Sequence, residues 1–139
     1  MNKLYRLDIQ KIEHYFINHK DNNRQLKYRE LELLKPKNEI EMNTGGGRSG
    51  KMSTPTENKA ILLAGDKRFQ NLQQIVNTIE SMYAKLDRDL KTIVDMRYWD
   101  IDGCYEWENI ADKLYMTRHK VLRKRNILSD KTAERIGWV

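Results

Sequence analysis

The stretch Trp107–Leu128 limits the possible folds more than any other part of the sequence, because it predicts two short helices of opposite character. In Trp107–Leu114, apolar residues recur at the three- and four-residue spacing of one helix face. These residues are Trp107, Ile110, Ala111 and Leu114. Tyr115-Met116-Thr117 interrupts the pattern, and Arg118–Arg125 then carries five Lys or Arg residues and no acid. An apolar helix, a tight turn with an N-cap hydroxyl and a basic helix indicate a helix-turn-helix.

The distribution of charge is more informative than the net charge of +6. The segment Leu86–Asp112 has eight acids against three bases, whereas Lys113–Arg135 has eight bases against two acids. Such segregation places a basic face on one small domain, which an anionic partner can recognise. Double-stranded DNA fits this expectation, because each phosphate neutralised by a Lys or Arg releases a counterion and adds affinity.

Several function classes receive no support from the sequence. Cys104 is the only cysteine, and the three histidines are scattered, so neither a disulfide framework nor a metal site is predicted. No apolar run is long enough for a membrane span or a signal peptide, which predicts a soluble cytoplasmic protein with no membrane partner. No nucleophile–base pair stands out, so we expect no enzymatic activity and no cofactor.

Residues 1–35 are predicted to be an N-terminal helical segment. Its apolar stripe is irregular and consists of Leu4, Ile9, Ile12, Tyr15, Phe16 and His19. The polar stretch His19–Gln25 is interpreted as a turn between two helices, and Lys35-Pro36 as the end of the second. Because these helices are too short to form a core alone, they should pair with the C-terminal part or associate with another copy of the chain.

Residues 36–58 are predicted to be a flexible linker, because periodicity is lost and glycines are frequent. Gly45–Lys51 matches the start of a phosphate-binding P-loop, but Met52 occupies the position that needs a magnesium-binding hydroxyl. No apolar strand precedes the glycines either. A linker is therefore the favoured interpretation, and we expect no nucleotide binding.

Residues 59–139 are predicted to form a helical domain with the helix-turn-helix at about 106–128. The apolar positions from Phe69 to Ile93 could form one continuous coiled-coil seam. The favoured alternative is a break near Lys85–Asp87, with Asp87 as the N-cap of a compact helix. Asp100–Tyr105 would then form the turn into the Trp107 helix.

In the basic helix, Val121 and Leu128 define an inward face at about 100° per residue. The residues predicted to contact DNA are Thr117, Arg118, His119, Lys120, Arg123, Lys124 and Asn126. Arg123 can donate two hydrogen bonds to guanine, and Asn126 can bind adenine in a bidentate manner. Arg118 and Lys124 lie on the shoulders, where phosphates would run.

The residue order of the C-terminal half resembles region 4 of bacterial sigma factors. That order runs Leu86-Asp87-x-x-Leu90-x-x-Ile93-x-x-Met96-Arg97-Tyr98, then a loop, then Glu108-x-Ile110-Ala111-x-x-Leu114-x-x-Thr117-Arg118-x-x-Val121. The whole chain is similar to the RinA family of phage transcriptional regulators, which also join an N-terminal helical segment, a glycine-rich middle and a sigma-like helix-turn-helix. Two residues depart from the pattern: Tyr115 replaces a common turn glycine, and Thr117 replaces the commoner serine.

The resemblance implies an all-α regulator that binds double-stranded DNA and activates phage late genes. Host RNA polymerase and a second copy of the chain are further candidate partners, with the acidic stretch Asp87–Asp112 as a candidate polymerase contact. Two alternatives stay open. One is a DNA-packaging component similar to a small terminase subunit, and the other is a coiled-coil interaction protein.

Overall fold

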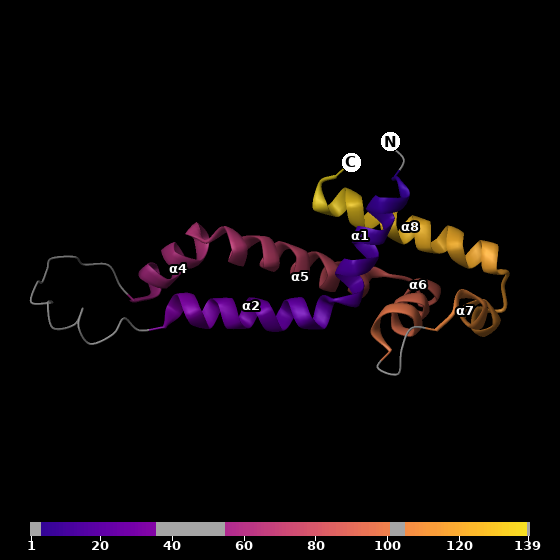
Figure 1. Ribbon diagram of the computed structural model, residues 1–139, viewed down its shortest axis with the longest axis horizontal. Helices are drawn as coiled ribbons and strands as arrows, with labels where there is room; N and C mark the ends of the chain where they lie inside the picture. Colours follow the sequence, from indigo (N-terminus) through magenta and orange to yellow (C-terminus); the bar gives the residue numbers. More distant parts are fainter. Residues whose placement is uncertain (1–3, 36–54, 101–104, 139) are drawn as a thin grey trace, which may run out of the picture. The chain divides into compact units, whose positions relative to one another are not determined.

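A computed structural model describes residues 4–35, 55–100 and 105–138 (Figure 1). The elements in chain order are α1 (Arg6–Ile17), α2 (His19–Leu34), α4 (Pro55–Gly65), α5 (Lys67–Lys85), α6 (Arg88–Ile93), the π-helical turn η2 (Val94–Trp99), α7 (Trp107–Leu114) and α8 (Arg118–Ile136). The described residues contain no strand, which confirms the all-α fold class. The P-loop-like segment Gly45–Lys51 and residues 101–104 of the predicted turn lie outside the described residues.

The chain divides into two compact units: residues 1–21 with 74–139, and residues 22–73. This division differs from the domains expected from the sequence, because α1 belongs to the same unit as α6, α7 and α8. The last residues of the predicted linker are also helical, since α4 begins at Pro55.

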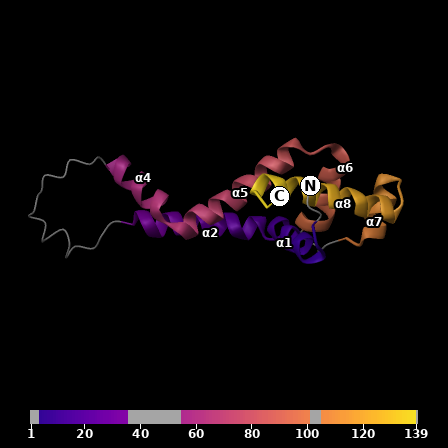
Figure 2. The same cartoon turned by 90° about the horizontal axis from the view of Figure 1, so that it is seen from above.

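The first unit is a small helical bundle in which α1 packs against α8 and η2, while α6 and α7 pack against α8 (Figure 1 and Figure 2). Its largest fully buried apolar side chains come from all of these elements and from the C-terminal part of α5: Ile12, Phe16, Ile79, Ile93, Val94, Ile110, Val121 and Leu128. The N-terminal helix therefore supplies part of the core around which the helix-turn-helix is built.

This packing divides the apolar residues of α1 into buried and exposed ones. Ile12 and Phe16 are buried, whereas Leu7 and Ile17 are exposed. The Asp8 carboxylate accepts a hydrogen bond from the Tyr5 backbone N–H at 3.0 Å, which stabilises the start of the helix. The helix ends at Asn18, whose backbone N–H donates to the His14 carbonyl at 2.9 Å.

The predicted turn at His19–Gln25 is wrong, because α2 begins at His19 and is helical throughout that stretch. The interruption between α1 and α2 is Asn18 alone. Polar residues predict exposure to solvent, and an exposed helix accommodates them without a break.

The predicted break between α5 and α6 is confirmed. The alternative, one continuous coiled-coil seam from Phe69 to Ile93, is therefore not formed. Asp87 is the N-cap of α6, since its side chain accepts a hydrogen bond from the Leu90 N–H at 2.9 Å. The sequence did not predict that this helix continues as the π-helical turn η2. Two consecutive η2 residues bond to α1: Tyr98 OH donates to Glu13 at 2.6 Å, and Trp99 Nε1 donates to the Phe16 carbonyl at 2.9 Å.

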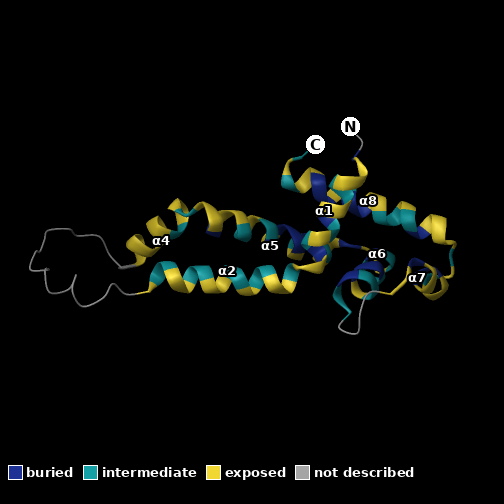
Figure 3. Ribbon diagram, in the orientation of Figure 1, coloured by how far each residue is buried: buried dark blue, intermediate teal, exposed yellow. Residues whose placement is uncertain are grey.

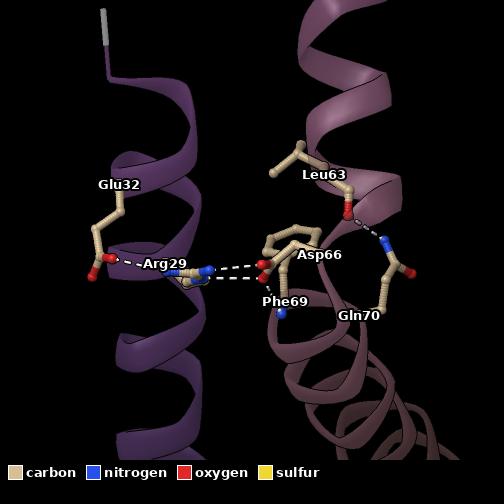
Figure 4. Close-up of polar contacts among 6 residues, drawn as sticks. All are labelled: Arg29, Glu32, Leu63, Asp66, Phe69 and Gln70. Carbon is tan, nitrogen blue, oxygen red and sulfur yellow. Dashed lines mark hydrogen bonds and ion pairs between the residues drawn. The ribbon is translucent and has the colours of Figure 1, made fainter. Parts of the chain in front are cut away.

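The second unit contains the part of α2 from Asn22, α4, and α5 up to Gln73, and it has little core (Figure 3). Phe69 is the one buried residue among those described in this unit. The contact between α2 and α5 depends on Asp66, whose two carboxylate oxygens accept from Arg29 at 2.6 and 3.0 Å (Figure 4). The same carboxylate accepts from the Phe69 N–H at 2.8 Å and caps α5, so the hydrogen bonds from Arg29 and Phe69 lower its pKa to about 2.

We predict that acid destabilises the first unit through His19. Its ring stacks on Trp99 with centroids 5.6 Å apart, and its Nδ1 is buried without a hydrogen-bond partner among the described residues. Burial lowers the pKa of His19 below its usual 6.5, and the Glu80 carboxylate opposes this shift without cancelling it. The unfolded chain therefore takes up a proton first, so stability should be fully present above pH 6.5 and fall as the pH drops through the lowered pKa.

Urea unfolding between pH 7.5 and 5 measures this dependence. The His19→Gln variant should lose most of it, whereas the control His119→Gln, at an exposed position of α8, should retain it. Equal pH dependence in the wild type and in His19→Gln would contradict the assignment.

Candidate nucleic-acid interface

Helix α7 has the bounds predicted from its apolar spacing, and its first residue fixes it to the bundle. Trp107 is buried, and the guanidinium carbons of Arg97 and Arg125 lie 4.6 and 5.5 Å from its ring centroid. Ile110 and Ala111 are buried one turn later. Cation–π contacts of this kind position α7 from two neighbouring elements, η2 and α8.

The turn after α7 shows how the chain tolerates the absence of a turn glycine. Tyr115 adopts the left-handed conformation, with φ 56° and ψ 44°, and its side chain is 96% exposed. Its N–H donates to the Asp112 carbonyl at 3.2 Å, and the Met116 N–H donates to the Ala111 carbonyl at 3.0 Å. The backbone therefore forms a helix C-cap that glycine usually occupies, with tyrosine in its place.

Thr117 caps α8 as predicted: its Oγ1 accepts from the Lys120 N–H at 3.1 Å. The helix continues well past the expected end at Leu128 and ends at Ile136, where Gly137 takes φ 98°. After the helix, the ring of Trp138 lies 6.2 Å from that of Tyr15 in α1. The C-terminal half of α8 and the residues after it thus belong to the core of the first unit.

The start of α8 presents the predicted face to solvent. Val121 and Leu128 are buried, and the side chains expected to meet base edges are exposed on the other side. Those exposed residues are His119, Lys120, Arg123 and Asn126. Asn126 Oδ1 accepts a hydrogen bond from Arg125 Nε at 2.9 Å, so this oxygen is already engaged within the helix.

The two residues expected on the phosphate shoulders each have a carboxylate partner. Arg118 Nε lies 2.9 Å from Glu108, and Lys124 Nζ lies 3.5 Å from Asp89 of α6. These carboxylates compete with a phosphate for the same cation. Lys124 is also half-buried, so it is less available to a phosphate than the sequence alone suggested.

Arg125 has a structural role that the sequence analysis missed. Its guanidinium lies 3.5 Å from the Glu13 carboxylate, which also accepts the hydroxyl hydrogen bond of Tyr98. Burial, and then the charge of Glu13, raise the pKa of Tyr98, so the phenol stays protonated. The four-residue spacing from Val121 to Arg125 could have revealed this role, because it places Arg125 near the inward face.

The net positive charge of α8 comes from its first turns, because after Asn126 the acids Asp130 and Glu134 balance the bases Lys131 and Arg135. At 100° per residue, Asp130 and Glu134 lie on the same outward face as Arg123 and Asn126, but further along the helix. The charge of this face therefore changes sign after Asn126. A duplex would therefore be attracted to residues 118–126 more than to the part of the helix beyond them.

Several acids of the proposed polymerase-facing stretch stabilise the fold instead. Asp87 caps α6, Asp89 pairs with Lys124, and Asp95 accepts the Tyr83 hydroxyl at 2.8 Å. Glu106 and Asp112 are exposed at either end of α7. The part of the stretch that a partner could contact is thus smaller than the sequence count suggests.

In the described ranges no group of three or more His, Cys, Asp or Glu side chains is placed to hold a metal ion. None of the described helices combines the length and the apolar character needed to cross a membrane.

The fold and the candidate interface define an all-α protein in which a tight turn joins α7 to the basic start of α8. The chain belongs to the family described as "Protein of unknown function (DUF722)", whose sequence profile matches residues 3–134. No curated protein and no solved structure matches the chain. The family match spans both units.

We predict that Tyr115→Gly stabilises the protein by up to about 1 kcal/mol, because a left-handed conformation costs an L-residue roughly that much. Tyr115→Val should destabilise it by about 1 kcal/mol, since a β-branched side chain fits this conformation least. Chemical denaturation measures both changes. The control Tyr105→Gly, at an exposed tyrosine without positive φ, should be neutral or destabilising. A stabilising Tyr105→Gly of equal size would contradict the turn argument.

Proposed function

We propose that the chain binds double-stranded DNA through α7 and α8, with the start of α8 in the major groove. One observation carries this proposal. His119, Lys120, Arg123 and Asn126 are exposed together on the first turns of α8, directly after a tight turn from α7. This is the placement that groove recognition requires, because the N-terminal residues of the second helix contact the base edges.

The exposed side chains differ in the part of DNA that they can bind. The Arg123 guanidinium can donate two hydrogen bonds to guanine O6 and N7, and the Asn126 amide can pair with adenine N6 and N7. Lys120 and Arg118 lie toward the helix start, where their cations and the helix N–H groups favour phosphate. His119 lies beside Arg123 on the outward face and is the remaining exposed side chain that is proposed to contact DNA.

We further propose that this DNA binding serves phage transcription, as an activator of late genes acting with host RNA polymerase. The support is the sigma region 4-like and RinA-like order of residues in the C-terminal half. The helix bounds around that order, including the Asp87 and Thr117 caps, agree with the proposal. Glu106 and Asp112, exposed at the two ends of α7, are the candidate polymerase contacts.

We predict that Arg123→Ala costs about 1–3 kcal/mol on the preferred duplex and relaxes base preference at one position. Lys120→Ala should weaken binding to all duplexes about equally and lower the salt dependence by about one charge. Selection from random duplex DNA, followed by binding titrations at several salt concentrations, measures both effects. The preferred duplex is taken from the same selection.

Lys131→Ala is the matched control, since Lys131 is an exposed lysine of α8 beyond Asp130. It should leave affinity and salt dependence almost unchanged. If Lys131→Ala weakens binding as much as Lys120→Ala, or if no duplex is selected at moderate salt, the proposed interface is wrong.

A further inference from the structure

The second unit exposes large apolar side chains on a helix pair that buries little of its own. On α2, Tyr28 is 59% and Leu31 is 67% exposed, and Ile61 and Leu62 of α4 are exposed as well. Phe69 is the one side chain that this unit buries in its described part. With one buried side chain among its described residues, this unit buries too little apolar surface to offset the entropy of ordering its helices. The apolar surface therefore favours a partner.

The register of α2 indicates what covers this surface. Arg29 faces Asp66 of the same unit, so the inward face of α2 is fixed by that ion pair. Tyr28 and Leu31 lie on the opposite face, three residues apart, at the spacing of neighbouring a and d positions in a heptad. Lys27 and Glu32 then occupy the flanking g and e positions, one positive and one negative. Both side chains are exposed.

We propose that α2 pairs in parallel with α2 of a second copy of this chain. Tyr28 and Leu31 form the apolar seam, and each Lys27 forms an ion pair with Glu32 of the partner subunit. Glu32 already bonds to Arg29 at 3.0 Å within its own helix, which orders its carboxylate at the edge of the seam. Lys27 has no carboxylate partner within the described ranges.

Charge selects the parallel arrangement over the antiparallel one. In a parallel pair related by a two-fold axis along the helices, opposite flanks of the two helices face each other, so Lys27 meets the partner's Glu32. In an antiparallel pair the two-fold axis is perpendicular to the helices, and identical flanks lie together. Lys27 would then lie on the same side as Lys27 of the partner subunit, and the two copies of Glu32 would also share a side. Like charges at these positions disfavour that arrangement.

A parallel pair brings the same ends of the two helices together. The chain enters the second unit through the N-terminal part of α2, so both copies of residues 1–21 attach at that end. A dimer of this kind could present two recognition helices to two half-sites, with the gain in affinity that a high effective concentration provides. The pairing itself does not rest on DNA binding, and it is measured without DNA.

Sedimentation of the full chain at about 10–200 μM tests the pairing, because a seam of two apolar layers makes a weak dimer. The wild type should dimerise. Each single reversal, Lys27→Glu or Glu32→Lys, places like charges in contact and should raise the dimer Kd roughly tenfold. The double variant Lys27→Glu/Glu32→Lys restores opposite charges and should recover most of the affinity.

Leu31→Arg should abolish dimerisation, and Leu7→Arg provides the matched control. Leu7 is an equally exposed leucine on α1 in the first unit, so its replacement should leave the dimer intact. Circular dichroism spectra of both variants should match the wild type, since neither side chain is buried. A loss of helix in Leu31→Arg alone would show that Leu31 supports its own chain, and would overturn the proposal.

Cysteine cross-linking distinguishes the two orientations. In a Cys104→Ser background, Leu31→Cys should form a disulfide-linked dimer by itself, because identical residues meet in a parallel pair. An antiparallel pair would instead cross-link a mixture of Tyr28→Cys and Leu31→Cys chains more readily than either alone. That result, a strictly monomeric chain, or a ring insensitive to these substitutions would overturn the proposal. A ring would favour the packaging role over regulation.

Discussion

The Glu13 carboxylate connects the N-terminal helix to the helix-turn-helix, and the orientation of α8 depends on it. It accepts the Tyr98 hydroxyl at 2.6 Å and lies 3.5 Å from Arg125, so one carboxylate joins α1, η2 and α8. Arg125 also lies over the ring of Trp107, which begins α7. Because a partly buried charge is tolerated only when it is paired, this network allows few rotations of α8 about its axis. The side of α8 that faces solvent follows from that constraint.

The bases of α8 therefore have two different roles, and helical spacing separates them. Arg125 follows the buried Val121 by one turn and points inward, whereas Arg123 points outward with His119. Lys124 lies between these directions and pairs with Asp89. Counting the bases of this helix overestimates the charge available to a nucleic acid, because two of the five Lys or Arg side chains in Arg118–Arg125 are inward or half-buried and have carboxylate partners.

The features that could be predicted from the sequence are those set by local chemistry. Residues within one or two turns determine the bounds of α7, the caps formed by Asp87 and Thr117, and the outward face of α8. The features that could not be predicted depend on contacts distant in sequence. Tyr98 bonds to a residue 85 positions earlier, and Arg29 pairs with a residue 37 positions later. The polar stretch His19–Gln25 predicts a turn but is part of α2. Whether polar residues mark a turn or an exposed helix also depends on contacts distant in sequence. No local signal marked the π-helical turn η2.

The two units also differ in how they respond to protons, which bears on how independently they can act. The pKa of Asp66 is lowered to about 2, so the stability that its bonds to Arg29 and Phe69 provide is fully present above the carboxylate's usual 3.8 and is lost as the pH falls toward 2. The pKa of His19 is lowered from 6.5, so the first unit loses stability at a higher pH than the second.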